Sequence, residues 1–283
     1  MQANFTHCAA LVREADRDRY LAALFAPADR RNALLSLYAF DLEIARVRDV
    51  AREPMPGEIR LQWWRDVLEG KRDAEAAAHP VAAALLETLR QHHLPRAPLL
   101  DLIEARSFDL YDDPMSTFAE LQGYARLTAG TIVEAAARVL ADNLSAAAVD
   151  LAHAAGEALT LAAVLTKLPL HTARGQLYVP LETLIAYGAK YEDIFARKAT
   201  TELRTALAEL RLRARSHLSR IGEEAKEIST RASPAFLPLA PLRPLLLQME
   251  RRHYDPFRPL LMAPWRRQWR IWRAAGNLGR IGR

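Results

Sequence analysis

Apolar residues recur every three or four positions along most of the chain, as they do on the buried face of an α-helix. The alternation of β-branched and polar residues that is typical of strands is missing, and no internal repeat is found. Prolines fall between the periodic segments rather than within them, where the ends of helices belong. The pattern therefore predicts an all-α protein.

The clearest predicted helix begins at Asp29, a favourable N-cap residue, and runs to about Arg52, shortly before Pro54. Spacings of three and four place a set of apolar residues on one face of this helix. The members of this set are Leu34, Leu37, Tyr38, Leu42 and Ala45. We expect this face to pack against the rest of the protein.

Two carboxylates, Asp41 and Asp49, fall on the same apolar face of that helix. Burying a carboxylate without a partner is costly, so each needs a polar environment or a cation. One interpretation is that both side chains face a polar cavity. The other is that the neighbouring Arg46 and Arg48 satisfy them, or that this end of the helix is solvated. The sequence leaves both open.

A second long helix is predicted from near Ser145 to a point before Pro169. Residues 158–165 are apolar on all sides, which indicates a helix that is buried on several faces. Lys167 falls in the last turn, where a cation interacts favourably with the negative end of the helix dipole.

Between these helices, Leu99–Tyr111 is predicted to be helical and Asp112–Pro114 to form a turn. Thr117 with Glu120 three residues later predicts a capping box that opens the next helix. Asp109 and the two turn aspartates have the spacing of a carboxylate cluster that binds a hard cation. Because D-D-P is more typical of a solvated turn, we assign the latter two to the turn and leave a cavity role open for Asp109.

Composition excludes several classes of protein. The 51% hydrophobic content is ample for a core, and Lys plus Arg exceed Asp plus Glu by 39 to 34, a net charge of +5. The single cysteine, Cys8, excludes an internal disulfide. We expect no secretion signal and no apolar run near the roughly 20 residues that span a bilayer. Metal-binding histidine spacings, thiol-nucleophile arrangements and nucleotide-binding glycine-rich loops are also missing from the sequence.

The C-terminal segment from about residue 264, PWRRQWRIWRAAGNLGRIGR, is basic and rich in tryptophan. Trp265, Trp269 and Trp272 share one helical face, and arginines occupy the remainder: Arg266, Arg267, Arg270 and Arg273. Such a segment either lies on an anionic membrane surface or docks on a partner, or its tryptophans pack back on the domain. A nucleic-acid partner is not expected, since the basic residues form one short segment rather than a broad face.

Five segments in order carry a family likeness. They are L-Y-A-F at 37–40, Q-W-W-R at 62–65, H-P-V at 79–81, L-I-E-A-R-S-F-D-L at 102–110 and R-G-Q-L-Y-V-P at 174–180. Together they resemble the squalene/phytoene synthase family over about residues 15–275. The resemblance implies one all-α prenyltransferase-type domain, covering residues 1–283, around a central cavity. It also implies an ancestral activity, the head-to-head joining of two isoprenoid diphosphates with magnesium.

The two aspartate-rich motifs that hold magnesium in active members are altered here. The first corresponds to residues 45–49, where only Asp49 is acidic. In the other motif, Lys167 and His171 occupy the positions of the two acids. In the R-G-R-x-Y segment that follows it, Gln176 occupies the position of the R that precedes x. Magnesium needs several oxygen ligands, and cations in their place repel it. We therefore expect no metal, no other cofactor and no ordinary magnesium-dependent condensation.

One branch of the family has the closer resemblance, carried by F-D-L-E-I-A-R-V-R-D, R-L-Q-W-W-R, A-R-S-F-D-L and L-P-L-H-T-A-R. This branch contains the assembly factor of mitochondrial respiratory complex I. The resemblance implies a pseudoenzyme whose partners are complex I subunits or assembly intermediates. It also implies a peripheral position on the inner face of the cytoplasmic membrane, or on the matrix side if the protein is organellar. The alternative is a head-to-head isoprenoid synthase with degenerate metal motifs.

The same resemblance implies a cavity lined by a set of side chains. One hypothesis is that it binds an isoprenoid or another lipid-like anion without converting it, and the other is that it is structurally inert. No catalytic residue is assigned within this set. Its members are Tyr38, Asp41, Asp49, Asp109, Lys167, His171, Arg174 and Tyr178.

Overall fold

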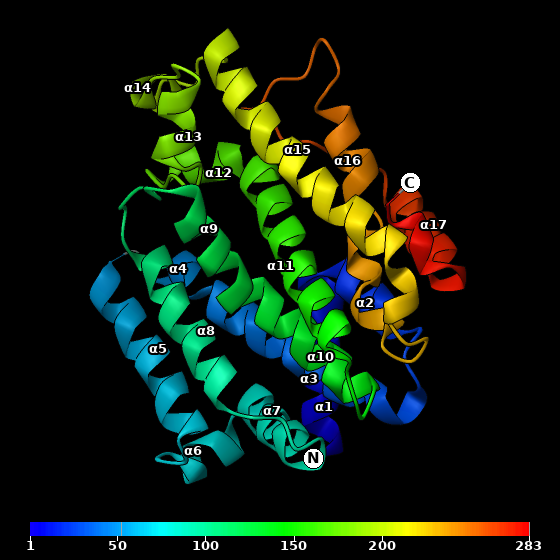
Figure 1. Ribbon diagram of the computed structural model, residues 1–283. Coiled ribbons are helices and arrows are strands. Elements are labelled where there is room, and N and C mark those ends of the chain that lie inside the picture. Colours follow the sequence, from blue (N-terminus) through cyan, green and yellow to red (C-terminus); the bar gives the residue numbers. More distant parts are fainter. Residues whose placement is uncertain (52, 283) are drawn as a thin grey trace.

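A computed structural model describes residues 1–51 and 53–282 of the chain, and within these residues it contains helices and loops but no strand (Figure 1). The prediction of an all-α protein is confirmed. The helices pack around a core in which segments far apart in sequence meet, such as α1 (Gln2–Ala15) with α7 (Pro80–Gln91).

The remaining helices differ widely in length, from single turns to more than five turns. The α-helices are α2 (Arg17–Ala23), α3 (Ala28–Ala45), α4 (Val47–Val50), α5 (Pro54–Leu68), α6 (Asp73–Ala78), α8 (Ala97–Ser107), α9 (Phe118–Ala125), α10 (Thr131–Leu140), α11 (Ala146–Thr166), α12 (Leu168–Ala173), α13 (Leu181–Ala186), α14 (Tyr191–Phe195), α15 (Thr201–Glu223), α16 (Leu242–Gln248) and α17 (Pro264–Gly276). Short 3₁₀-helices are Phe108–Leu110, Ala225–Glu227, Ser233–Ala235, Leu237–Leu239 and Leu278–Arg280, and Arg126–Gly130 is a π-helical turn.

The helix predicted from Asp29 is divided in two. It begins after Pro27 and ends at Ala45, and α4 follows it; the predicted end near Arg52 lies outside the described residues. The assignment of Asp29 as the N-cap is wrong. Pro27 takes that position because its carbonyl accepts the first backbone hydrogen bonds. Asp29 is then the second residue of the helix, where its carboxylate pairs with Arg30.

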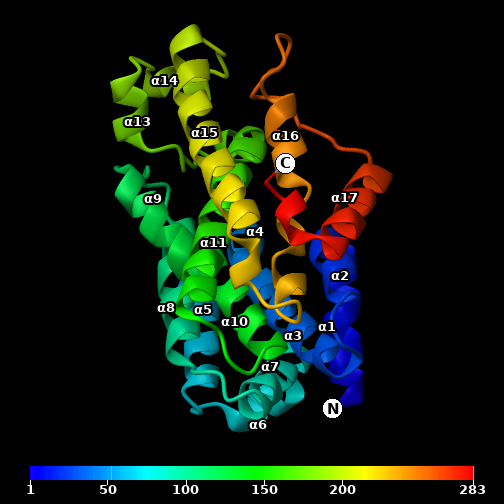
Figure 2. The same ribbon diagram turned by 45° about the vertical axis from the view of Figure 1, so that its right-hand side comes forward.

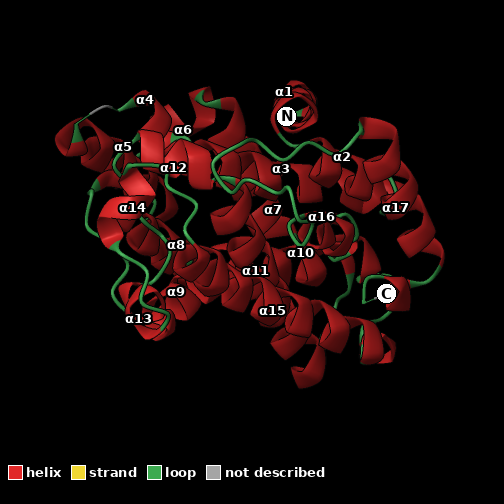
Figure 3. Ribbon diagram, turned by 90° about the horizontal axis from the view of Figure 1, so that it is seen from above, coloured by secondary structure: helices red, strands yellow, loops and turns green. Residues whose placement is uncertain are grey.

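Helix α11 lies in the middle of the bundle, between α15 on one side and α10 on the other (Figures 1 and 3). Its predicted start is confirmed, because the Ser145 side chain accepts a hydrogen bond from the amide of Ala148. Its 21 residues are long and apolar enough to cross a membrane, which corrects the expectation that no such run exists. However, 67% of that window is buried inside the protein, as expected for a central core helix.

Local signals in the middle of the chain were interpreted correctly. Helix α8 and the 3₁₀-helix after it cover most of the segment predicted as helical. The Thr117 and Glu120 side chains form both hydrogen bonds of the predicted capping box at α9. Asp112 and Asp113 are exposed in an irregular turn, as expected for a solvated D-D-P segment.

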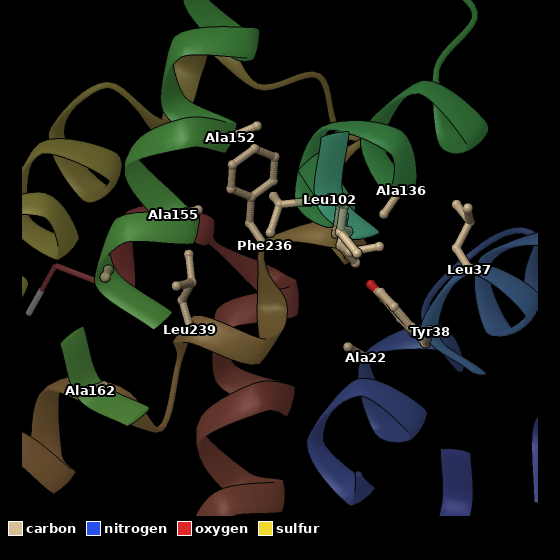
Figure 4. Packing of buried hydrophobic residues seen from close by; sticks show 14 of the residues in the cluster. Ala22, Leu37, Tyr38, Leu102, Ala136, Ala152, Ala155, Ala162, Phe236 and Leu239 are labelled. Carbon is tan, nitrogen blue, oxygen red and sulfur yellow. The ribbon is translucent and has the colours of Figure 1, made fainter. Parts of the chain in front are cut away.

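Near the C-terminal part of the chain, the segment that contains the 3₁₀-helices at 233–239 passes through the interior. Phe236 and Leu239 are almost inaccessible to solvent, and their side chains lie beside Ala152 and Ala155 of α11 (Figure 4). The small residues of α11 allow this close approach, since an interior packed to crystal-like density has no room for larger ones. The alanine-rich composition of α11 thus reflects crowding at the centre of the fold.

The tightest helix crossing in the core joins α11 to the π-helical turn, through Gly156 and Gly130. A Cβ atom on Gly156 would lie only 2.2 Å from the amide nitrogen of Gly130. We expect Gly156→Ala to lower the free energy of unfolding by about 1–3 kcal/mol, the usual cost of overpacking. Urea unfolding followed by circular dichroism measures this change.

Gly123 of α9 supplies the matched control, because a Cβ atom there would meet nothing within 4 Å. Gly123→Ala is expected to be neutral or to stabilise by up to about 1 kcal/mol, the difference in helix propensity between the two residues. Equal stability changes in the two variants would show that the crossing tolerates a methyl group.

Candidate functional site

A cavity of about 470 Å³ opens at the end of α11, and its walls come from helices throughout the chain. This volume lies in the range of small-molecule sites. Its lining combines charged and hydrogen-bonding side chains from α2, α3, α11 and α12 with apolar ones from α11 and α16. The cavity therefore matches an amphiphile better than a fully polar ligand.

Asp41 of α3 lines the cavity as a buried side chain, and two arginines neutralise it. Its carboxylate lies 2.6 Å from Arg19 Nη1 and 3.5 Å from Arg106 Nη2. Burial alone would raise the pKa of Asp41, but the two guanidinium groups outweigh it and hold the pKa below its usual range. Asp41 is thus an anion that is already compensated by the protein.

Asp109 is the centre of a second hydrogen-bonded group. Tyr178 and Tyr124 donate their hydroxyl protons to its carboxylate over 2.7 and 2.8 Å, and Arg106 Nη1 lies 3.2 Å away. Gln176 donates to the main-chain carbonyl of the same residue over 2.9 Å. Burial, and then the negative charge of Asp109, raise the pKa of Tyr178, so the hydroxyl remains protonated and continues to donate.

Asp49 lies at the rim of the cavity, where Arg174 Nη1 approaches its carboxylate to 2.5 Å. Arg48 also lines the cavity, and its Nη2 lies 2.9 Å from the carboxylate of the exposed Asp112. The sequence left open whether Arg46 and Arg48 satisfy Asp41 and Asp49. The arginines that the structure brings to these two carboxylates come instead from distant segments.

Lys167 and His171 occupy the junction of α11 and α12 and both line the cavity. The Lys167 side chain is accessible to water in the cavity, yet the protein surrounds it, and burial followed by repulsion from Arg106 lowers its pKa. Burial, Lys167 and Arg174 together lower the pKa of His171 to about 4, so its ring is neutral near pH 7. Its Nδ1 is buried and has no hydrogen-bond partner within the described part of the chain.

Of the eight side chains expected at the cavity, seven line it and Tyr38 does not. The Tyr38 ring is buried in the core below Arg19, whose guanidinium carbon lies 5.2 Å from the ring centroid. Its hydroxyl has no hydrogen-bond partner among the described residues (Figure 4). Tyr38 thus supports the wall from behind, because helical periodicity gives its face but not the depth of the cavity.

Three functional side chains were missed by sequence reasoning: Arg19, Arg106 and Tyr124. Arg106 could have been found from the sequence. It belongs to the L-I-E-A-R-S-F-D-L segment and precedes Asp109 by three residues, which places the two on the same helical face. Arg19 gives no such signal, because it is 22 residues from Asp41 and only the packing of α2 on α3 brings the two together.

The three tryptophans of α17 point away from the domain, although a tryptophan stripe is usually a buried one. Trp265, Trp269 and Trp272 expose 63%, 44% and 64% of their surface. The opposite face carries Ile271 and Ala274, which are buried against the domain beside α2 (Figure 2). Of the interpretations left open, packing of the tryptophans on their own domain is therefore wrong.

Arginines surround the exposed tryptophans of α17. The guanidinium groups of Arg266, Arg270 and Arg273 lie 4.5–5.7 Å from the nearest indole centroids. Arg267 differs from these three, because it turns inward, pairs with Asp18 of α2 and lines the cavity. One face of α17 thus closes the cavity wall while the other presents aromatic and cationic groups to solvent.

Magnesium does not fit this set of donors. The described residues contain no group of three or more His, Cys, Asp or Glu side chains placed to hold a metal ion. Asp41, Asp49 and Asp109 already form ion pairs with arginines. Lys167 and His171 occupy positions where further metal ligands would be required. A cation in this position would meet guanidinium and ammonium groups rather than free carboxylate oxygens.

Comparison with known proteins gives a consistent result. Residues 12–273 match the family model described as squalene/phytoene synthase. The chain is 28% identical over 255 residues to "NADH dehydrogenase (ubiquinone) complex I, assembly factor 6" of Mus musculus, covering 90% of this chain and 76% of the relative. It is 25% identical to the 15-cis-phytoene synthase of Synechococcus elongatus, covering 88% and 84%. A dehydrosqualene synthase crystal structure superimposes with a TM-score of 0.83 at 20% identity, covering 98% and 97%.

Proposed function

The chain belongs to the squalene/phytoene synthase family, and from this premise we propose that it is a non-catalytic member that acts as an assembly factor for respiratory complex I, the NADH:quinone oxidoreductase. The observation that carries the proposal is the pairing of every cavity carboxylate with an arginine, next to Lys167 and His171. Similarity to complex I assembly factor 6 supplies the identity of the partner: complex I subunits or assembly intermediates.

The electrostatics of the cavity argue against magnesium-dependent condensation. Ionisation of a diphosphate needs divalent cations that bridge its oxygens to several free carboxylates. Here the carboxylates of Asp41 and Asp49 form ion pairs with arginines instead. The nitrogen–oxygen distances from Arg19, Arg106 and Arg174 are 2.5–3.5 Å. The family cavity is therefore retained as a binding space rather than as a catalytic one, and an isoprenoid or other lipid is its proposed occupant.

A specific observation favours a second candidate, an isoprenoid synthase of altered mechanism. Asp109, Tyr124, Tyr178 and Arg174 remain assembled around an open cavity, and the phytoene synthase of Synechococcus elongatus is a relative of comparable identity. Such an enzyme would release diphosphate by using arginine and lysine side chains in place of metal ions. The two candidates predict different cellular defects, so one experiment separates them.

The decisive experiment is deletion of the gene in the native host. We expect loss of assembled complex I on native gels and loss of NADH:quinone activity, with an unchanged isoprenoid profile, and recovery of both when the gene is restored. Normal complex I in the deletion strain would overturn the proposal. Loss of a carotenoid, squalene or hopanoid product with normal complex I would establish the second candidate instead.

We place this function at the membrane, on the inner face of the cytoplasmic membrane or on the matrix side in an organelle. The support is α17, whose exposed tryptophans and surrounding arginines combine apolar and electrostatic attraction for an anionic lipid surface. Complex I is assembled in a membrane, so a peripheral helix of this kind would bring the protein to its partner.

A further inference from the structure

Lys167 differs from the other cations of the cavity because no acid lies within ion-pair distance of it among the residues that the structure describes. Its ammonium group has no hydrogen bond and no ion pair within the described part of the chain, although it stands at the junction of two helices that line the cavity. Burial and then Arg106 lower the pKa of this ammonium group, and the more distant Asp49 and Asp41 offset only part of that effect. An anion placed beside it would oppose that shift.

The other charged side chains around the cavity are paired within the protein. The lining acids are Asp16, Asp18, Asp41, Asp49 and Asp109, and each lies within ion-pair distance of an arginine. The lining cations are Arg19, Arg48, Arg106, Lys167, Arg174 and Arg267. Each of these arginines lies within ion-pair distance of an aspartate, and the partner of Arg48 is Asp112, which does not line the cavity. His171 adds no charge near pH 7, since its pKa is about 4. Lys167 is therefore the lining cation that has no ion pair among the described residues, and it remains available to a ligand anion.

An apolar path leads away from this ammonium group along α11. Ala163 and Leu159 precede Lys167 by four and eight positions, so they lie on the same helical face, and both line the cavity. At a rise of 1.5 Å per residue, this face extends about 12 Å from Lys167. Leu242, Leu245 and Leu260 line the cavity as well and complete its apolar wall. The space suits a single hydrocarbon chain.

We propose, on the basis of the non-catalytic cavity in the proposed function, that Lys167 directly binds the anionic head group of a single-chain amphiphile without a metal ion. The head group is a carboxylate or a phosphate monoester, and its chain lies along the Leu159 and Ala163 face of α11. The position that corresponds to a magnesium-binding acid in active relatives thus serves as the anion-binding group itself.

The test is titration calorimetry with three ten-carbon probes in EDTA: decyl phosphate, decanoate and the neutral decanol. We expect at least one of the two anions to bind at least 10-fold more tightly than decanol, and added Mg²⁺ to give no increase. The ratio between decyl phosphate and decanoate identifies the head group. Equal binding of the anions and the alcohol, or binding that requires Mg²⁺, would overturn the proposal.

Lys167→Gln tests the residue itself. A hydrogen bond to a charged group contributes about 1.5–3 kcal/mol, so the affinity for the preferred anion should fall about 10- to 100-fold while that for decanol is unchanged. Lys190→Gln is the matched control, since Lys190 is exposed and does not line the cavity. Without ligand, Lys167→Gln should melt no lower than the wild type, because it removes an uncompensated cation.

An unchanged affinity of Lys167→Gln for the anion would contradict the assignment even if the cavity binds lipid. These binding results decide the anion site, whereas complex I levels in the deletion strain decide the proposed function. Failure of the one is therefore distinguishable from failure of the other.

Discussion

Replacement of Asp41 by alanine is expected to lower the free energy of unfolding by about 3–5 kcal/mol, the usual cost of breaking a buried ion pair by removing one partner. The carboxylate is 4% exposed and lies between Arg19 and Arg106, which would both remain buried near their present positions. Two guanidinium groups would then repel each other in a poorly solvated site. Urea unfolding followed by circular dichroism measures the loss.

Asp49→Ala is the matched control for Asp41→Ala. Asp49 also pairs with an arginine that lines the cavity, but the two side chains are 46% and 35% exposed. Exposed pairs contribute about 0–1 kcal/mol, so this variant should be close to the wild type in stability. A similar loss in both variants would show that the Asp41 cluster is not the electrostatic centre of the cavity.

The effect of Asp41→Ala should also depend on pH. Although burial opposes it, Arg19 and Arg106 hold the pKa of Asp41 below its ordinary value of 3.8. The unfolded chain therefore takes up a proton at a higher pH than the folded one, and the stabilisation by Asp41 is present above 3.8 and lost below it. The difference in stability between wild type and variant should shrink as the pH falls below 3.8.

The second large effect concerns binding to membranes. Replacing Trp265, Trp269 and Trp272 together by glutamine should weaken binding to phosphatidylserine-containing vesicles by about 100-fold or more, because each indole loses its burial at the lipid interface. The buried face of α17, with Ile271 and Ala274, is untouched, so the fold should persist. Vesicle sedimentation gives the affinity, and thermal melting verifies the fold.

The arginines of α17 should act differently from its tryptophans. In a variant with glutamine at Arg266, Arg270 and Arg273, binding should lose its dependence on anionic lipid and on salt, since each arginine near such a surface contributes about 1 kcal/mol. Arg267 is left intact, because it pairs with Asp18 inside the fold. Vesicle affinity that is equal in wild type and both variants would show that α17 contacts a protein instead.

The sequence by itself determined the features that depend on neighbouring residues. Helical periodicity gave the all-α class, and hydroxyl and acidic side chains gave the starts of α9 and α11, since caps form within one turn of the chain. The substitution of Lys167 and His171 for acids was also visible, because it is a matter of residue type. The prediction of Asp29 as the N-cap was wrong because Pro27, two residues earlier, already occupies the N-cap position.

Only the tertiary structure decided which charges meet. Arg174 and Asp49 are 125 residues apart, and Arg106 reaches Asp41 across 65 residues, so no local pattern could pair them. The outward direction of the α17 tryptophans was equally hidden, since an amphipathic pattern gives two faces and not which of them is buried. That choice appears only in the packing: Ile271 and Ala274 are buried, α17 contacts α2, and Arg267 pairs with Asp18 of α2.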